Sequence, residues 1–358
     1  MSIFISILIF LTILIAAIVV HELGHFITAK RSKVKVEELG LGFPPRLLSF
    51  KRGETVYSLN LIPLGGFCGM AGEEDPDVPG SLAGKSVKTR LLVLSAGSLF
   101  MLLFPLLLLP IAYMIPMARP VEDGGVQVES VAEGSPAEQA GIKTGDIILS
   151  IDGQEVKTFD DIQNEIDRAL DTKPGEEVTL LLLRDDTQLE KTLIPREEYP
   201  SDEGPLGIGM GYIMETHAYP PWEAIPKGLG EYGQLLVAAK DALASLIAGE
   251  VPLKDAVAGP IGIAQMTGEV AAMGAAPLFR LAALISVSLA IVNLLPIPGL
   301  DGGRIVFVAI EGIRRGKRIS AKKEGMIHLI GFALLLMLIV LVSYNDVMRL
   351  MSGEGFIR

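Results

Sequence analysis

Four long runs of apolar residues dominate the pattern of hydrophobic and polar positions. They lie at residues 1–20, 91–118, 281–300 and 326–344, and none contains Asp, Glu, Lys or Arg. A helix needs about 20 such residues to cross the hydrocarbon core of a bilayer. The runs therefore predict about four transmembrane helices. A signal peptide is the alternative for the first run, but no Lys or Arg opens it and no small-x-small cleavage site follows it.

A region of different character separates the second and third runs. Strands are indicated by alternating apolar positions, by an Asp-Gly turn and by a pair of runs rich in strand-forming residues. Two short stretches have the spacing of apolar residues typical of helices. The strand signals lie at 126–131, 146–156 and 176–195, and the helical stretches at 135–142 and 160–170. We expect residues 119–216 to form one inserted α+β domain.

Two further segments have patterns of their own. Residues 34–70 contain two strand-like runs around the polar stretch 51–54, which predicts a β-hairpin. Residues 221–249 predict a mildly amphipathic helix. Trp222 and Tyr232 favour an interface between lipid and water for it, and its charged residues argue against a fifth span.

Composition and charge divide the chain in the same way. Half of the residues are apolar and the net charge is −11, but residues 119–227 hold 24 acidic and only 9 basic residues. The remainder is slightly basic, and no basic stripe with interleaved aromatic residues is present, so nucleic acid is not expected as a partner. Cys68 is the only cysteine, which excludes an intrachain disulfide and a CxxC metal site.

The distribution of Lys and Arg predicts the orientation of the membrane helices. Basic residues gather at 30–35 and at 314–323, and Arg90 precedes the second apolar run. Positively charged short loops stay on the cytoplasmic side. The loops at 30–90 and 304–325 are therefore expected inside, and both termini and the acidic region at 120–280 outside.

The sequence HELGH ends the first apolar run and carries the strongest chemical signal. Residues four apart share one face of a helix, so His21 and His25 can bind one metal ion. Glu22 lies beside the first ligand, where it can take a proton from water. The alternatives are a chance match and a pair of histidines that cap a helix.

A catalytic zinc ion takes three protein ligands, so a third is required. His217 lies in the acidic domain, and His328 lies near the start of the fourth run. Asp301 follows a break that PIPG imposes on the third run, and a carboxylate at that depth needs a cation. The alternative for Asp301 is an N-cap of the next helix. Asn293, on the third run, is interpreted either as a substrate contact or as a polar contact between helices.

HELGH on the first run and NLLPIPGLDG on the third resemble the paired motifs HExxH and NxxPxPxLDG of the site-2 protease family of intramembrane zinc metalloproteases. The resemblance covers nearly the whole chain and implies that His21, His25 and Asp301 bind Zn²⁺. It implies Glu22 as the catalytic base and Asn293 as a substrate-binding residue. The hairpin at 34–70 resembles the membrane re-entrant hairpin of the family, with an ordinary cytosolic hairpin as its alternative. The stretch GPIGIAQ at 259–265 also resembles bacterial members, whereas Arg304 stands where many of them carry histidine.

The inserted domain at 119–216 resembles a bacterial PDZ domain of permuted strand order. In that order the loop that binds a peptide carboxylate comes late, and GPLGIGM at 204–210 matches it. The resemblance places Leu206, Gly207 and Ile208 at the peptide. Such domains capture a peptide as an added strand. The alternative is an inert spacer that shields the active site.

The sequence thus predicts a polytopic α-helical membrane protein with a membrane-associated β-hairpin and one extracytoplasmic PDZ domain. Four divisions are expected along the chain. They are an N-terminal membrane part at 1–118, the PDZ domain at 119–216, an interfacial helix and linker at 217–280, and a C-terminal membrane part at 281–358. The function expected is zinc-dependent hydrolysis of a peptide bond in the transmembrane segment of a membrane protein, in the cytoplasmic membrane of a bacterium. The resemblance suggests anti-sigma factors or signal-peptide remnants as substrates. Two other functions remain open, namely a membrane-anchored PDZ adaptor with a structural zinc and an ion transporter.

Overall fold

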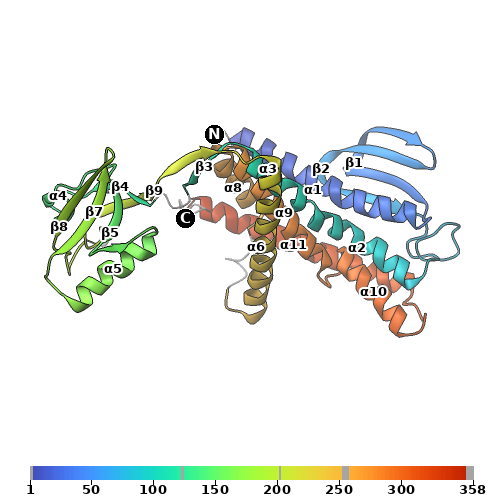
Figure 1. Ribbon diagram of the computed structural model, residues 1–358. Coiled ribbons are helices and arrows are strands. Elements are labelled where there is room, and N and C mark those ends of the chain that lie inside the picture. Colours follow the sequence, from blue (N-terminus) through green and yellow to red (C-terminus); the bar gives the residue numbers. More distant parts are fainter. Residues whose placement is uncertain (1–2, 122–124, 201–202, 252–257, 352–358) are drawn as a thin grey trace. The chain divides into compact units, whose positions relative to one another are not determined.

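The chain forms two compact units in the computed structural model, which describes residues 3–351 except 122–124, 201–202 and 252–257 (Figure 1). One unit comprises Met1–Ile115 and Tyr219–Arg358, and the other is Pro116–Ala218. The sequence-based boundaries of the inserted domain are 119 and 216.

The first unit is mainly helical, and four of its helices are long and apolar enough to cross a membrane. These candidate spans are Phe4–Arg31, Val87–Met114, Ala275–Leu294 and Lys322–Arg349. The expected number of about four is confirmed. The helices of the unit are α1 (Ile3–Arg31), α2 (Val87–Leu103), α3 (Pro105–Met114), α6 (Pro221–Ala248), α8 (Pro260–Ala272), α9 (Ala275–Leu294), α10 (Asp301–Ile313) and α11 (Ala321–Met351).

The helix boundaries differ from the limits of the apolar runs. Helix α1 continues through HELGH to Arg31, because nothing in that stretch breaks a helix. Helix α9 ends at Leu294, before the end of the third run, because Pro296 and Pro298 lack backbone donors. Gly299 then takes a φ of +99°, which side chains disfavour. Helix α8 was not expected from the sequence.

Strands β1 (Val36–Arg52) and β2 (Thr55–Met70) form the expected hairpin around the turn at Gly53, which has φ +64°. Both strands fold back on themselves. Residues 38–41 of β1 pair with 56–59 on one side and with 66–69 on the other. The segment Gly66–Met70 therefore forms one edge of this small sheet.

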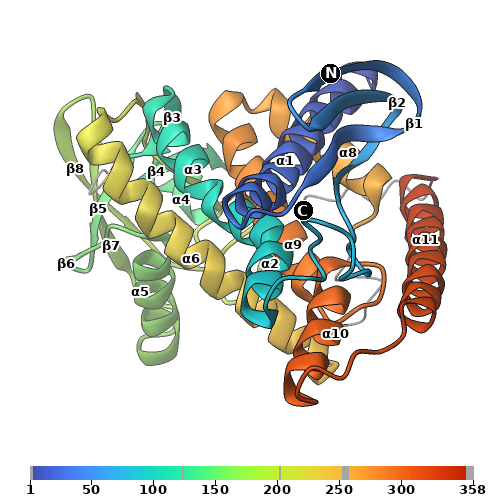
Figure 2. The same ribbon diagram turned by 90° about the vertical axis from the view of Figure 1, so that its right-hand side faces the viewer.

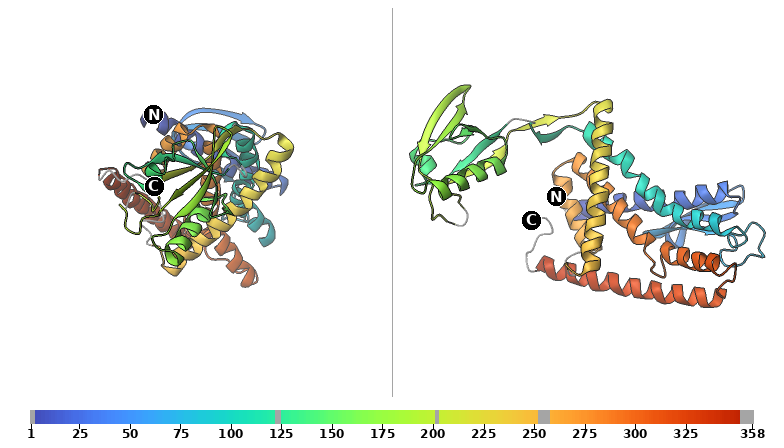
Figure 3. Two further views of the ribbon diagram at one scale, coloured as in Figure 1. Left: turned by 60° about the vertical axis from the view of Figure 1, so that its left-hand side comes forward. Right: turned by 60° about the horizontal axis from the view of Figure 1, so that its bottom comes forward.

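Helix α6 runs at a steep angle to α1 and α11 (Figures 1 and 3). It packs on α3, where a Cβ atom on Gly228 would lie 2.6 Å from the backbone nitrogen of Pro110. The hydroxyl of Tyr232 donates to the carbonyl of Leu102 at 2.8 Å. Trp222, at the start of the helix, is 74% exposed. These contacts attach the first half of α6 to the second span.

The second unit is a small α+β domain. Its main sheet has the order β8-β7-β5-β4-β9 with all neighbours antiparallel, β6 pairs with β5, and β9 forms one edge. The strands are β4 (Val126–Val131), β5 (Ile147–Ile151), β6 (Gln154–Glu155), β7 (Val178–Arg184), β8 (Thr187–Leu193) and β9 (Ile208–Tyr212). A separate ribbon pairs β3 (Met117–Pro120) with β10 (Met214–His217).

Helices α4 (Pro136–Gln139) and α5 (Phe159–Thr172) complete the second unit, and the strands and helices expected within it are confirmed. Helix α5 places Ile162 and Ile166 in the same core as Leu180 and Leu182 of the sheet. Its start is fixed by a capping box. The Thr158 hydroxyl accepts from the N–H of Asp161, and the Asp161 carboxylate accepts from the N–H of Thr158.

Candidate metal centre

Helix α1 presents both imidazoles of HELGH on one face, as their spacing predicts. The ring of His25 is buried, and its Nδ1 donates to the carbonyl of Val93 on α2 at 2.9 Å. This hydrogen bond leaves the Nε2 of His25 unprotonated, as a metal ligand must be. The Nε2 atoms of His21 and His25 lie 3.1 Å apart.

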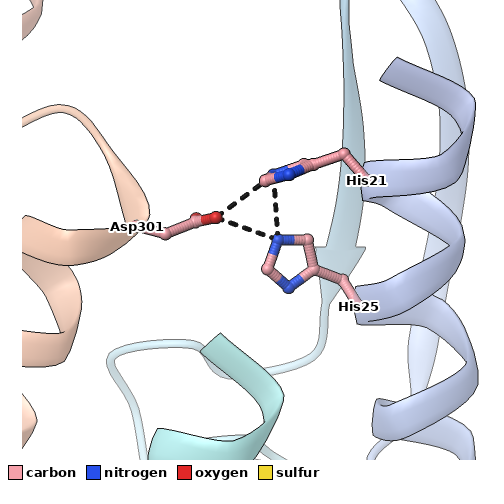
Figure 4. Close-up of side chains that lie close together, drawn as sticks. All are labelled: His21, His25 and Asp301. Carbon is pink, nitrogen blue, oxygen red and sulfur yellow. Dashed lines mark hydrogen bonds and ion pairs between the residues drawn. The ribbon is translucent and has the colours of Figure 1, made fainter. Parts of the chain in front are cut away.

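Helix α10 places the carboxylate of Asp301 opposite the two rings (Figure 4). The Oδ2 atom lies 3.1 Å from Nε2 of His21 and 3.1 Å from Nε2 of His25. The N-cap of α10 is Leu300, without a side-chain cap, and Asp301 is the first helical residue. The alternative interpretation of Asp301 as an N-cap is therefore wrong.

Glycines allow these groups to approach one another. A Cβ atom on Gly97 of α2 would lie 2.4 Å from Nε2 of His25 and 2.7 Å from the ring of His21. On Gly302 it would lie 2.0 Å from the carbonyl oxygen of Leu295, so the start of α10 packs directly on the preceding turn. Side chains at these two positions would displace the ligands or the turn.

The three side chains fit a zinc site by their chemistry and spacing. Their ligand atoms all lie within 4.8 Å of one another, and two are imidazole nitrogens and one a carboxylate oxygen. Zinc bonds of 2.0–2.2 Å in tetrahedral geometry separate ligand atoms by about 3.3 Å, close to the arrangement here. Among the described residues, no fourth His, Cys, Asp or Glu belongs to the group. Three ligands leave a coordination position open, which is typical of a catalytic zinc rather than a structural one.

A cavity of about 410 Å³ adjoins this cluster. It is lined by Glu22, by the hairpin edge Gly66–Met70 and by the turn before Asp301. Burial, followed by the charges of Glu22 and Glu73, raises the pKa of the Cys68 thiol to about 12, so this thiol stays neutral. Arg304 also lines the cavity and donates to Glu73 at 2.5 Å.

The other polar residues considered as ligands or contacts have different surroundings. His328 accepts a hydrogen bond from the N–H of Gly299 and is not part of the cluster. His217 belongs to β10 in the other unit. Asn293 lies near the end of α9 and is half-buried.

Two residues that support the cluster, Gly97 and Glu73, were not predicted from the sequence. Gly97 leaves room for both rings, and its only local signal is the small-residue stretch SAGS within an apolar run. Glu73 holds Arg304 and also accepts from the N–H of Met70 at 3.1 Å. Neither role can be derived without the packing of distant segments.

The late loop of the inserted domain precedes the edge strand β9. Leu206 is buried in the core of the domain, and its carbonyl accepts from the N–H of Ala137. Gly207 has φ +72°, and its N–H donates to the carbonyl of Gly204. Ile208 begins β9 and pairs with Val131.

Two histidines, a carboxylate, an adjacent glutamate and an open position together define a metal-dependent hydrolase of the HExxH class. Residues 9–338 match the model of peptidase family M50. The chain belongs to this family, which is the site-2 protease family, and the resemblance seen in the sequence is confirmed.

Relatives span nearly the whole chain. A protein of Clostridium perfringens is 38% identical over 333 residues, covering 93% of this chain and 95% of that protein. Zinc metalloprotease RasP of Geobacillus kaustophilus is 31% identical and covers 96% of this chain and 98% of that protein. Regulator of sigma-W protease RasP of Bacillus subtilis is 30% identical, with coverages of 92% and 95%.

The protein is therefore an enzyme, a zinc metalloprotease of the site-2 protease family. Its four apolar helices make it a multi-pass membrane protein. The adaptor and transporter functions that the sequence left open are set aside by this membership.

Proposed function

We propose that this enzyme hydrolyses a peptide bond within or next to the membrane-spanning segment of a membrane protein. The observation that carries the proposal is the position of the Asp301–His21–His25 cluster near the end of an apolar spanning helix. A rise of 1.5 Å per residue places His21 roughly 27 Å along α1 from Ile3, close to the far boundary of a hydrocarbon core about 30 Å thick.

His21, His25 and Asp301 would hold the zinc ion, and Glu22 would act as the base. Zinc at such a site polarises a scissile carbonyl and lowers the pKa of water. Glu22 takes the proton of the attacking water and delivers it to the leaving amine. The hydrogen bond from His25 to Val93 keeps the ring oriented during this cycle.

The substrate would bind as an extended strand, because a helix hides its carbonyls in hydrogen bonds. The edge Gly66–Met70 borders the cavity beside Glu22 and is suited to strand addition. A second, apolar cavity of about 580 Å³ lies between α1 and the hairpin and also reaches Glu22. Its lining, which includes Leu23, Leu41 and Phe50, suits apolar side chains of a membrane segment. Asn293 is proposed as a further substrate contact, through its carboxamide.

The orientation proposed follows from the basic residues. Lys30 and Arg31 end α1, and basic residues at 314–323 join α10 to α11. Positive residues on the cytoplasmic side would place the metal site toward the cytoplasm and Pro116–Ala218 outside, in the cytoplasmic membrane. Helix α6 would then lie at the outer surface of the bilayer, as its exposed Trp222 favours.

We propose that Pro116–Ala218 is a PDZ domain that binds the C-terminus of a peptide along β9. The edge position of β9 and the left-handed Gly207 before it support this. Leu206, Gly207 and Ile208 would contribute their backbones to the peptide site. The name of the Bacillus subtilis relative, a regulator of sigma-W protease, favours an anti-sigma factor as the substrate class.

The test is cleavage of a reconstituted single-span substrate by the Glu22→Gln variant. Glutamine cannot accept the proton, so we expect zinc to stay bound and cleavage to fall by about 10²–10⁴-fold. Glu223→Gln, on the exposed start of α6, is the matched control and should cleave normally. Turnover by Glu22→Gln at the rate of the control would reject Glu22 as the base. Cleavage only outside the membrane segment would reject the proposed substrate.

A further inference from the structure

The turn between α9 and α10 is held by a side chain from another helix. Within the turn, the N–H of Ile297 donates to Leu295 at 2.7 Å, and the N–H of Leu300 donates to Ile297 at 3.2 Å. Pro296 and Pro298 have no N–H to donate. The N–H of Gly299 instead donates to Nδ1 of His328 on α11, at 2.9 Å. This bond ties the turn to α11.

Helix α11 also packs against the backbone of the same turn. A Cβ atom on Gly331 would lie 2.1 Å from the carbonyl oxygen of Pro298. One on Gly299 would lie 2.9 Å from the backbone nitrogen of Phe332. His328 and Gly331 are three residues apart and therefore share one face of α11. That face of α11 therefore provides the turn with a hydrogen-bond acceptor, from His328, and with close backbone contact, at Gly331.

The turn in question positions Asp301, which follows Gly299 by two residues. Gly303 packs on the turn from the other side, because a Cβ atom there would lie 2.6 Å from the carbonyl oxygen of Ile297. The turn thus lies between α10 and α11, with little room to shift. Since the carboxylate of Asp301 must meet both imidazoles at once, small movements of the turn change the metal site.

The geometry of His328 makes it an acceptor and not a ligand. Its Nδ1 accepts the N–H of Gly299, so the imidazole proton lies on Nε2. The Nε2 atom is buried and has no hydrogen-bond partner among the described residues. The ring also packs on Phe307 of α10, with ring centres 5.4 Å apart.

We propose that His328 is a positioning residue of the metal site. By accepting the N–H of Gly299 it fixes the turn that directs Asp301 at His21 and His25, and so sets zinc affinity from the fourth spanning helix. The inference rests on the proposed function in one respect, namely that His21, His25 and Asp301 are the zinc ligands. It requires neither a substrate nor a role for Glu22.

The experiment compares His328→Leu with His328→Asn in the full-length protein. Asparagine places its Oδ1 where histidine has Nδ1, whereas leucine has the same branching without an acceptor. Zinc affinity of each apoprotein is measured by competition with a chelator of known affinity. We expect His328→Leu to bind zinc about 10–100-fold more weakly, the effect usual for partners that orient ligands. His328→Asn should restore most of the affinity.

A second variant and a control keep the test decisive. His328→Gln moves the acceptor one bond further from the backbone, so its zinc affinity should resemble that of His328→Leu. The glutamine variant therefore replaces the leucine variant if the latter does not fold. The control is Asp346→Ala, at the other end of α11. The Asp346 carboxylate accepts from the N–H groups of Gly259 and Gly262 at 3.2 and 2.9 Å, so its loss loosens α11 far from the turn.

Two outcomes would overturn the proposal. One is equal zinc affinity in the leucine and asparagine variants. The other is a loss in Asp346→Ala as large as that in His328→Leu, which would indicate general docking of α11 and not the hydrogen bond. Because no substrate is present, the result is independent of the Glu22→Gln cleavage test. Failure of either proposal leaves the other one standing.

Discussion

The carboxylate of Asp301 lies 3.1 Å from Nε2 of His25, although 276 residues separate the two in the chain. The two residues belong to different helices, so no single secondary-structure element holds this contact. Helix α1 supplies the imidazole, and the first residue of helix α10 supplies the carboxylate. A buried carboxylate beside two imidazoles is stable when a cation or protons compensate its charge. With zinc bound as proposed, the ion would therefore become part of the packing of this unit.

Zinc should stabilise the fold, and removal of a ligand should abolish this effect. In Asp301→Ala we expect the zinc-dependent rise in melting temperature to be lost, because two imidazoles alone bind zinc weakly. About 100-fold weaker binding removes about 2.7 kcal/mol of zinc-linked stabilisation. Glu22→Gln should keep the full rise. Thermal unfolding in detergent, with zinc and with chelator, measures both. A wild-type rise in Asp301→Ala would place the third ligand elsewhere.

Gly97→Ala should weaken zinc binding although position 97 carries no ligand. The added methyl group would lie 2.4 Å from Nε2 of His25, so α2 or the imidazoles must move. We expect about 10–100-fold weaker zinc binding, as for changes around other metal ligands. Gly230→Ala in α6 is the control, because nothing lies within 4 Å of the added Cβ. Both changes raise helix propensity equally, so a difference between them reports the contact.

The sequence predicted those parts of the site that depend on local periodicity. His21 and His25 share a helix face because they are four apart, and this holds wherever the helix lies. The end of α9 follows from Pro296 and Pro298, which no helix interior tolerates well. The position of Asp301 opposite the imidazoles was predicted from its depth in the membrane and from the family resemblance, because spacing along the chain does not bring two helices together.

The parts that the sequence did not predict depend on contacts between distant segments. Gly97 matters only because α2 lies against the imidazoles, and the small residues of SAGS around it do not indicate which groups approach. His328 was weighed as a ligand, yet it holds the turn. Helix α8 was missed because its 13 residues are too short for a span and mix apolar residues with glycine and threonine. The boundaries of helices differ for the same reason, since capping and packing fix them.

The buried ion pair between Arg90 and Glu311 should be important for stability. Arg90 donates to Glu311 at 2.5 Å, and each side chain is only 9% exposed. Glu311→Gln leaves the guanidinium of Arg90 buried without its counter-charge, which we expect to cost about 3 kcal/mol. The melting temperature in detergent should fall accordingly.

Two comparisons identify the cause of that loss. The double variant Arg90→Met, Glu311→Met should be more stable than Glu311→Gln, because no buried charge is left unpaired. Arg318, the other partner of Glu311 at 3.0 Å, is 32% exposed and still donates to the carbonyl of Ala83. Asp241→Asn removes an exposed partner of Lys240 and should leave the melting temperature unchanged. A double variant less stable than Glu311→Gln would mean that the pair itself, and not the avoidance of a lone charge, stabilises the fold.

Acid should destabilise the inserted domain through Asp146. Burial works to raise the pKa of this carboxyl, but hydrogen bonds from Arg184 and from the N–H of Lys143 outweigh burial and lower the pKa. The unfolded chain therefore takes up a proton before the folded domain does, and stability rises with pH in this range. The contribution is complete above the unfolded pKa of about 3.9 and is lost as the pH falls through the lower folded value.

Asp146→Asn should reduce this pH dependence in the domain Pro116–Ala218 expressed alone, which has its own core. At pH 7 we expect the variant to lose about 2 kcal/mol, because hydrogen bonds to a charged group are replaced by weaker ones. Urea unfolding at a series of pH values from about 6 to about 2.5 gives the free energy of unfolding of both proteins. The two curves should converge as the pH falls, since protonation of Asp146 in the wild type produces the same loss. Parallel curves would show that other carboxylates cause the acid sensitivity.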